Sequence, residues 1–326
     1  MPKVICLGEA VIDLFASPVG VPLKEASSFV PSPGGAPANV AVALSRLGIE
    51  VGFIGRVGDD PFGLLLIELL QSEGVNTTYF RSVVGSPTTV AFVAASSPNE
   101  QDFILYRGAD TKLRPEDLSR PYIASAEIFL YGSVTLTDAS RGAALQAVSW
   151  ANEDGVLVAY DANLRPALWQ SLQAARYGIL EGMRDVTVCK LNETELELLA
   201  GTSDLEAGSR WILNQGPRLC LITLGPRGAY FNNGRAEGYV PAFSVKAVDS
   251  TGCGDAFFAG LVFGILETGL PPEALDESTL RHLVHFANAA GALTATRQGA
   301  MAALPTRMEV ESFLQRASTS SEGWTE

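Results

Sequence analysis

The chain has 326 residues, of which 23 are Lys or Arg and 36 are Asp or Glu, so its formal net charge is -13. A hydrophobic content of 47% at this length predicts a large buried core, in one large domain or two smaller ones, rather than a disordered chain. An acidic chain without a run of Lys or Arg lacks the surface that binds phosphate backbones, which excludes nucleic acid as the expected partner.

Cysteine usage and hydropathy indicate the compartment. The four cysteines form no Cys-x-x-Cys pair, which excludes a zinc ribbon or a disulfide framework and favours a reduced compartment. The N-terminal apolar run is interrupted by Glu9 and Asp13 and is too short for a signal peptide. No stretch approaches the roughly 18 apolar residues of a membrane span. We expect a cytoplasmic protein with no membrane partner.

Short apolar runs rich in β-branched residues alternate with segments of helical period, which is typical of parallel strands joined by helices. The predicted strands cover residues 4–7, 51–54, 128–131, 156–160, 186–190 and 219–223. The predicted helices cover residues 38–47, 61–73, 140–153, 193–200, 205–214, 255–267 and 278–296. We expect an α/β fold, a doubly wound sheet with helices on both faces, in one domain over residues 1–316 with a flexible tail at 317–326.

Two stretches, residues 15–33 and 86–113, break this alternation. The second contains TTVAFVAASS and NEQDFILYR, which alternate as a hairpin does. They predict a small antiparallel sheet that is inserted into the main domain as a lid over a cleft. Ordinary edge strands of the main sheet are the alternative.

The segment DSTGCGDAFFAG at residues 249–260 has the strongest chemical signal. A strand-like stretch at 243–248 precedes it, and three small residues precede the helix: Gly252, Cys253 and Gly254. Such a segment lets backbone N–H groups converge at a helix N-terminus and predicts an anion site. Asp255 in the first turn either caps the helix or acts on a bound substrate. The segment lacks the lysine of a P-loop and has Phe257 in place of the third glycine of a dinucleotide fingerprint.

A second glycine segment, PSPGGAPANVAVALSRLG, covers residues 31–48. Gly34 and Gly35 would allow a ligand to approach the backbone closely, and Asn39 lies in the first turn of the helix that follows. A turn with a helix start is the alternative reading.

Together these segments resemble the two signatures of the ribokinase-like carbohydrate kinases, the PfkB family. Residues 34–63 are similar to the N-terminal signature, and VDSTGCGDAFFAG is similar to the C-terminal one. Further stretches also match the family, namely CKLNETE, LITLGPRGAYF and FANAAGALTATRQGAMAALP. The resemblance therefore covers the whole chain except the tail. Within the family, fructokinases are the most similar group on the basis of YDANLRPALW and YRGAD. The next most similar group is the 2-keto-3-deoxygluconate kinases.

The resemblance implies that a sugar hydroxyl attacks the γ-phosphate of ATP, with Asp255 as the base. The N–H groups of Gly252, Cys253 and Gly254 would stabilise the transferring phosphoryl group. Cys253 replaces the alanine that is usual in the family, and a thiol at a helix N-terminus is expected to have a lowered pKa.

The resemblance also assigns the substrate contacts. For the sugar these are Asp13, Gly34, Gly35, Asn39, Arg107 and Arg165. Asp13 could instead hold the second glycine loop by a hydrogen bond. Arg107, on the lid, could be a solvated surface arginine, and Arg165 could contact the phosphates instead.

For the nucleotide the matching residues are Asn163, Lys190, Asn192, Glu195, Thr223, Gly225, Gly228 and Asn288. Asn192 and Glu195 would position Mg²⁺ largely through water, with helix capping as the alternative, and Lys190 could simply end its strand. A monovalent cation such as K⁺ would bind the backbone at Asp249, Thr251, Thr294, Arg297, Gly299 and Ala303. His282 and His285 are taken as ordinary helix residues.

We therefore expect an ATP-dependent sugar kinase, a fructokinase that makes fructose 6-phosphate. The alternatives are a 2-keto-3-deoxygluconate kinase and a non-catalytic protein that binds a nucleotide or a sugar on the same fold. By resemblance, a homodimer through the lids is also expected.

Overall fold

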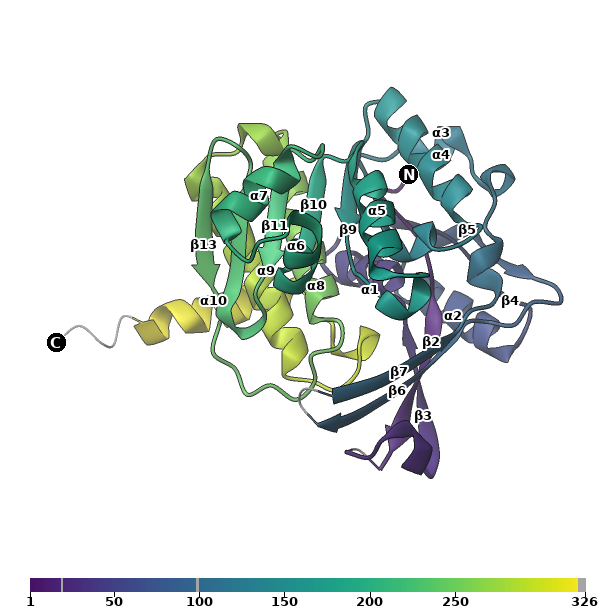
Figure 1. Cartoon of the computed structure of the whole chain (residues 1–326). Coiled ribbons are helices and arrows are strands. Elements are labelled where there is room, and N and C mark those ends of the chain that lie inside the picture. Colours follow the sequence, from purple (N-terminus) through teal and green to yellow (C-terminus); the bar gives the residue numbers. More distant parts are fainter. Residues whose placement is uncertain (19, 98–99, 322–326) are drawn as a thin grey trace.

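The computed structural model describes residues 1–18, 20–97 and 100–321, with side chains except at 95–97, 100–102 and 319–321. A nine-stranded sheet with helices on both faces forms the body, and a small four-stranded sheet projects from it (Figure 1). The strands of the large sheet are β1 (Val4–Leu7), β4 (Val51–Gly58), β5 (Asn76–Val83), β8 (Ile128–Gly132), β9 (Leu157–Asp161), β10 (Val188–Asn192), β11 (Leu219–Thr223), β12 (Gly228–Asn232) and β13 (Glu237–Pro241).

The strand order is β13-β12-β11-β10-β9-β8-β1-β4-β5. All pairings from β11 to β5 are parallel, and β12 pairs antiparallel with both of its neighbours. The predicted α/β sheet is confirmed. Since parallel strands end at one edge, the residues that follow them meet there.

Helices cover both faces of this sheet because its strands alternate between two cores. Val4 and Cys6 of β1 belong to one buried cluster, and Ile5 and Leu7 belong to the other. The first core also contains residues of α1 (Ala36–Arg46), α2 (Pro61–Ser72), α8 (Cys253–Thr268), α9 (Glu277–Ala295) and α10 (Arg307–Ser321). The second core contains residues of α3 (Arg120–Ile123), α4 (Arg141–Glu153), α5 (Leu172–Met183), α6 (Glu193–Ala200) and α7 (Leu205–Leu213).

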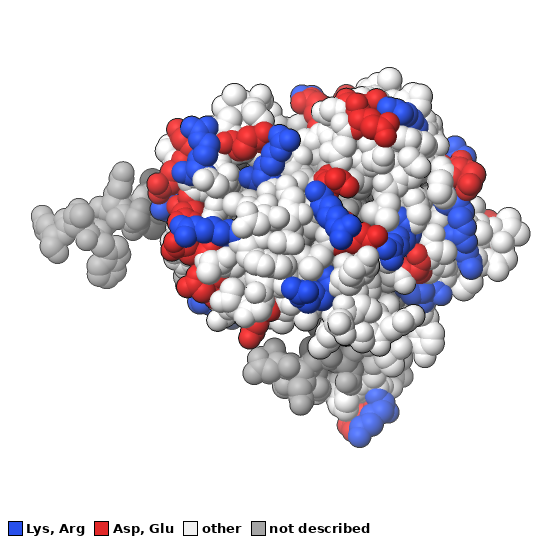
Figure 2. Space-filling model, turned by 45° about the horizontal axis from the view of Figure 1, so that its top comes forward, with Lys and Arg blue, Asp and Glu red and all other residues white. Residues whose placement is uncertain are grey.

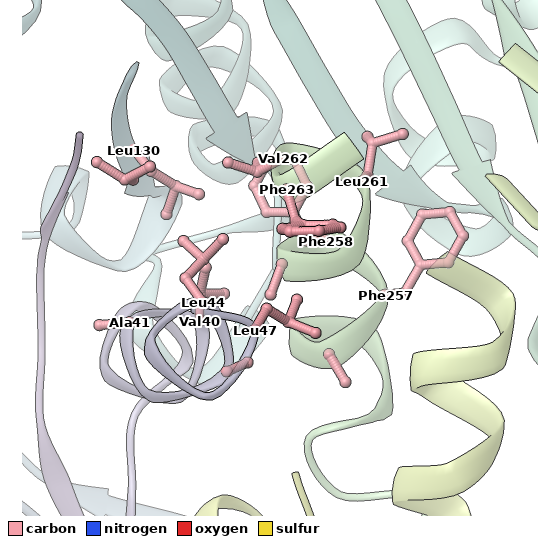
Figure 3. Close-up of a cluster of buried hydrophobic side chains, with 14 of the residues drawn as sticks. Val40, Ala41, Leu44, Leu47, Leu130, Phe257, Phe258, Leu261, Val262 and Phe263 are labelled. Atoms are coloured by element: carbon pink, nitrogen blue, oxygen red, sulfur yellow. The ribbon is translucent and has the colours of Figure 1, made fainter. Parts of the chain in front are cut away.

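The contact between α1 and α8 matters most for the site. Val40 and Leu44 of α1 face Phe258 and Val262 of α8, with Leu130 of β8 above them (Figure 3). Full burial of such side chains stabilises the fold by roughly 1.5–3 kcal/mol each. This packing holds the N-terminal turns of the two helices together.

The small sheet consists of β2 (Val11–Ser17), β3 (Ser28–Gly34), β6 (Val90–Ser97) and β7 (Glu100–Tyr106), in the order β3-β2-β6-β7. Its two outer pairings are antiparallel as predicted, but β2 and β6 are parallel. The reason is that β2 follows β1 and β6 follows β5, so both leave the same edge of a parallel sheet.

Other elements differ from the prediction. The elements not predicted are β5, β12, β13, α3, α5 and α10. Residues 243–248 form no strand, and the N–H of Val248 donates to the carbonyl of Ala295 instead. Helix α10 continues to Ser321, so part of the predicted tail is helical, while residues 322–326 lie outside the described residues.

Charges of both signs are interspersed over the face shown in Figure 2, without a patch of one sign. Within the described ranges, no helix has both the length and the apolar content needed to cross a membrane.

Candidate active site

A cavity of about 650 Å³ lies at the carboxyl ends of the central strands. Its lining comes from successive strands: Glu9 follows β1, Val134 follows β8, Asn163 follows β9 and Lys190 lies in β10. Two further walls complete the cavity, the first turn of α8 and the inner face of the small sheet. The apolar residues on that inner face are Phe15, Ala91, Val93, Phe103 and Leu105. This is where open α/β sheets bind ligands.

Asp255 lies at this cavity in the first turn of α8. Gly252, the N-cap, has φ +79°, a conformation that favours glycine, and Gly252, Gly254 and Asp255 all line the cavity. Oδ2 of Asp255 accepts a 2.7 Å hydrogen bond from Nδ2 of Asn39. Burial raises the pKa of Asp255, although Lys190 and the Asn39 hydrogen bond oppose the shift. A carboxyl group with a raised pKa is suited to accept a proton near neutral pH.

Lys190 supplies a buried positive charge beside this turn. Its Nζ lies 3.0 Å from both carboxylate oxygens of Asp161, and both side chains are buried. A Cβ at Gly254 would lie 3.2 Å from Nζ, so the ammonium group reaches the N-terminus of α8. Burial alone would lower the pKa of Lys190, but Asp161, Glu195 and Asp255 outweigh it and the pKa is raised.

Asn192 and Glu195 form a capping box at the start of α6. The backbone N–H of Glu195 donates to Oδ1 of Asn192, and Oε2 of Glu195 accepts from the N–H of Asn192. Oε1 of Glu195 accepts from the N–H of Leu164 at 2.7 Å and so holds the loop that carries Asn163. Burial raises the pKa of Glu195, against the effect of Lys190. Neither Asn192 nor Glu195 lines the cavity.

Asp13 and the glycine pair form another wall. A Cβ at Gly34 would lie 2.1 Å from Oδ2 of Asp13, and one at Gly35, where φ is +103°, would lie 2.5 Å from the carbonyl oxygen of Glu9. Residue 35 must therefore be glycine, and a side chain at residue 34 would displace the Asp13 carboxylate. Burial raises the pKa of Asp13 to about 7, with Arg165 lowering and Asp255 raising it. Arg165 is exposed and lines the cavity.

Arg107 does not line the cavity. Its Nε donates to Asp110 at 2.6 Å, its Nη1 donates to Thr137 at 3.0 Å, and its Nη2 lies 2.7 Å from Asp138. It is thus neither a solvated surface arginine nor a side chain pointing into the cavity.

The four remaining residues predicted for the nucleotide lie outside this cavity, around the turn between β11 and β12. Asn288 donates to the carbonyls of Val240 at 3.1 Å and Pro241 at 3.2 Å. A Cβ at Gly228 would lie 2.1 Å from the Val240 oxygen. Gly225 lies in the same turn, and Thr223 ends β11, the strand next to β10.

The segments predicted to bind a cation meet at one carboxylate. Oδ1 of Asp249 accepts from the N–H and the hydroxyl of Thr251, and Oδ2 accepts from the N–H of Gly299 at 3.0 Å. Thr294 and Ala303, which lie within five residues of Gly299 in the sequence, are fully buried. Arg297 forms an ion pair with Glu309.

No cluster of three or more His, Cys, Asp or Glu side chains that could hold a metal ion occurs in the described part of the chain. The ring of His285 packs against Phe243 at 4.7 Å between centroids, and burial lowers the pKa of His285.

The expected low pKa of Cys253 is wrong. Burial, and to a lesser degree Asp249 and Asp255, raise the pKa of its thiol to about 12. Cys253 does not line the cavity, and its Sγ lies 3.8 Å from the carbonyl oxygen of Asp249, so desolvation outweighs the helix dipole.

Two site residues were not predicted from the sequence: Glu9, which lines the cavity, and Asp161, which pairs with Lys190. Glu9 is 7% exposed and lines the cavity, and burial raises its pKa to about 7. The available signal was its position: like Asp161, it is an acidic residue at the carboxyl end of a buried strand.

The chain is similar to known carbohydrate kinases over most of its length. The sequence model of the pfkB family carbohydrate kinases matches residues 1–307. A probable fructokinase-3 of Arabidopsis thaliana is 41% identical over 318 residues, which cover 96% of this chain and 91% of the relative.

Two solved structures are similar over nearly the whole chain. A fructokinase from Xylella fastidiosa with bound ATP superposes with a TM-score of 0.88 at 34% identity, covering 98% of this chain and 100% of that one. A Vibrio cholerae fructokinase double mutant in a form that binds fructose, ADP and a potassium ion gives a TM-score of 0.83 at 32% identity, covering 96% and 98%. The chain belongs to the pfkB family of carbohydrate kinases and is a sugar phosphotransferase.

Proposed function

We propose that the protein is a fructokinase that transfers the γ-phosphate of ATP to the 6-hydroxyl of D-fructose. The observation that carries this proposal is the placement of Asp255 in the first turn of α8, where it lines the cavity and accepts a hydrogen bond from Asn39. The fructokinases among its relatives support the choice of sugar.

In the proposed reaction Asp255 accepts the proton of the attacking hydroxyl. The new O–P bond forms as the bond between the γ-phosphorus and the β–γ bridging oxygen breaks, and ADP leaves. General base catalysis of this kind contributes about 10²- to 10⁴-fold to the rate. The N–H groups of Gly252 and Gly254 and the ammonium group of Lys190 stabilise the charge on the transferring phosphoryl group, while the N–H of Cys253 donates to the carbonyl of Ser250.

Magnesium would neutralise charge on the phosphates of bound ATP. Both carboxylate oxygens of Glu195 accept backbone N–H groups, which supports contact with the metal through water rather than direct ligation. We also propose that a monovalent cation such as K⁺ binds the segments that Asp249 joins at Thr251 and Gly299.

A neutral sugar suits the cavity better than a sugar acid such as 2-keto-3-deoxygluconate. Glu9, Asp13 and Asp255 line the cavity, so three carboxyl groups surround the substrate. Arg107 is shared by Asp110 and Asp138, which leaves Arg165 as the available guanidinium among the described lining residues.

The outer face of the small sheet supports a homodimer through the lids. Phe29, Ile104 and Tyr106 are 37%, 47% and 61% exposed. A patch of this kind on a lid is typical of a protein interface. The four free cysteines, three of them buried, agree with a cytoplasmic location.

The kinase proposal is tested by ADP release with Mg-ATP over a panel of neutral sugars and sugar acids. We expect the highest kcat/KM with fructose. Asp255→Asn should lower kcat by about 10²-fold or more. Glu267→Gln, an exposed position on the same helix, is the matched control and should retain activity. Undiminished activity of Asp255→Asn, or a preference for the sugar acid, would contradict the proposal.

A further inference from the structure

Glu9 is a buried carboxyl group in the cavity wall without an assigned role. It is more than nine-tenths buried, and its Oε2 has no hydrogen-bond partner among the described residues. An unpaired buried carboxyl oxygen is unfavourable unless a ligand supplies a donor. The cavity that Glu9 lines is where such a donor would enter.

The strand order places Glu9 far from the phosphoryl-transfer end. Lys190, which reaches the α8 N-terminus, lies on β10 opposite Asp161 of β9. Asp161 is in turn opposite Gly132 of β8, and β8 pairs with β1, which Glu9 follows. Three strand spacings separate β10 from β1, or about 14 Å. Glu9 therefore lies at the β1 end of the cavity, away from Lys190 and the anion site that its ammonium group reaches.

Within the described part of the chain, no donor reaches Oε2 of Glu9. The nearest cation on the small-sheet side, Arg107, is engaged by Asp110, Thr137 and Asp138. A second lining residue, Asn39, likewise has a buried acceptor, Oδ1, that lacks a partner among the described residues. Two hydrogen-bond acceptors without a partner, Oε2 of Glu9 and Oδ1 of Asn39, are therefore suited to bind a ligand with several hydroxyl donors.

We propose that Glu9 is a sugar-positioning residue that accepts a hydrogen bond from a hydroxyl at the end of the sugar remote from the phosphorylated one. This inference rests on the proposed function, in which O6 of fructose lies at Asp255. The remote end of a ketohexose carries the 1-hydroxyl and the anomeric 2-hydroxyl, so Glu9 accepts a hydrogen bond from one of these two groups.

The test compares D-fructose with 1-deoxy-D-fructose and 2,5-anhydro-D-mannitol, which lack the 1-hydroxyl and the 2-hydroxyl respectively. The wild type should lose about 10- to 100-fold in kcat/KM on at least one analogue, because Glu9 is then left unpaired. In Glu9→Met, which keeps the side-chain length without the carboxyl group, the same analogue should be used within about threefold of fructose, since no acceptor remains to be left unpaired. The KM for ATP should stay unchanged. Glu127→Gln, an exposed carboxyl just before β8, is the control and should discriminate as the wild type does.

An equal loss on each analogue in the wild type and in Glu9→Met overturns the assignment. If Glu9→Met does not fold, as judged by thermal unfolding, Glu9→Ala takes its place under the same criterion. A wild type inactive on fructose but active on another sugar overturns the proposed substrate alone, and the comparison is then repeated with the deoxy analogues of that sugar. Inactivity on every sugar overturns both proposals.

Discussion

The side-chain amide of Asn39 donates a 2.7 Å hydrogen bond to Oδ2 of Asp255, 216 residues further along the chain. The contact exists because α1 and α8 pack along their lengths through Val40, Leu44 and Phe258 (Figure 3). It couples the glycine segment before α1 to the proposed catalytic base.

Replacing Asn39 should therefore change the pH dependence of the reaction. A hydrogen bond to the ionised carboxylate lowers the pKa of Asp255, so its loss in Asn39→Ala raises that pKa further. The acidic limb of the pH profile of kcat should move to higher pH, and kcat/KM should fall about tenfold at neutral pH. Asn214→Ala, at the exposed C-cap of α7, is the control. An unshifted profile would show that the hydrogen bond does not act on the base.

Lys190→Met separates a structural role of Lys190 from a role in phosphate binding. The substitution leaves Asp161 buried and unpaired, so the free energy of unfolding should fall by about 3–5 kcal/mol. The double variant Lys190→Met/Asp161→Asn should recover most of this stability in chemical denaturation. Its kcat should stay low because the positive charge at the anion site is still missing. Recovery of both stability and kcat would leave Lys190 with a structural role only.

Asp13 should make the ligand-free protein less stable as the pH rises. The pKa of Asp13 is about 7 in the folded state, whereas its ordinary value is 3.8. Between these two pH values the folded state keeps a proton on Asp13 that the unfolded state has lost. Stability from this group is therefore present at low pH and is lost as the pH rises toward 7. Asp13→Asn should raise Tm relative to the wild type at pH 8 and much less at pH 5, measured by thermal unfolding without sugar. An equal difference at both pH values would contradict this, and the exposed Glu50→Gln serves as the control.

Cys253 should react slowly with alkylating reagents. Its thiol pKa of about 12 leaves almost no thiolate at pH 7.5, and Cys6, Cys189 and Cys220 are buried with raised pKa values as well. Mass spectrometry after brief iodoacetamide treatment should find the native chain mostly unlabelled and the chain in guanidinium labelled at all four cysteines. Cys253→Ala should keep most of the activity, because this thiol does not line the cavity. Rapid labelling of Cys253 in the native protein would refute the raised pKa.

The central strands and long helices were predictable because their patterns are local. Strand β1 is a continuous apolar run, and α9 has a long helical period, so both were placed within a residue or two. Strand β5 was missed because it is a polar, largely exposed edge strand, and β13 because it is the other edge strand and contains glycine and proline. The parallel pairing of β2 with β6 depends on where two distant strands leave the main sheet.

The fold class, the family and the segments that carry the chemistry could be inferred from the amino-acid sequence, since glycine before a helix and an acid in its first turn are local signals. Tertiary structure alone decided which of these groups meet: Asn39 with Asp255, and Lys190 with Asp161. It also decided that Arg107 is held by carboxylates and that the Cys253 thiol is desolvated rather than activated. Distance and burial set hydrogen bonds, ion pairs and pKa values, and for residues far apart in the chain both follow only from packing.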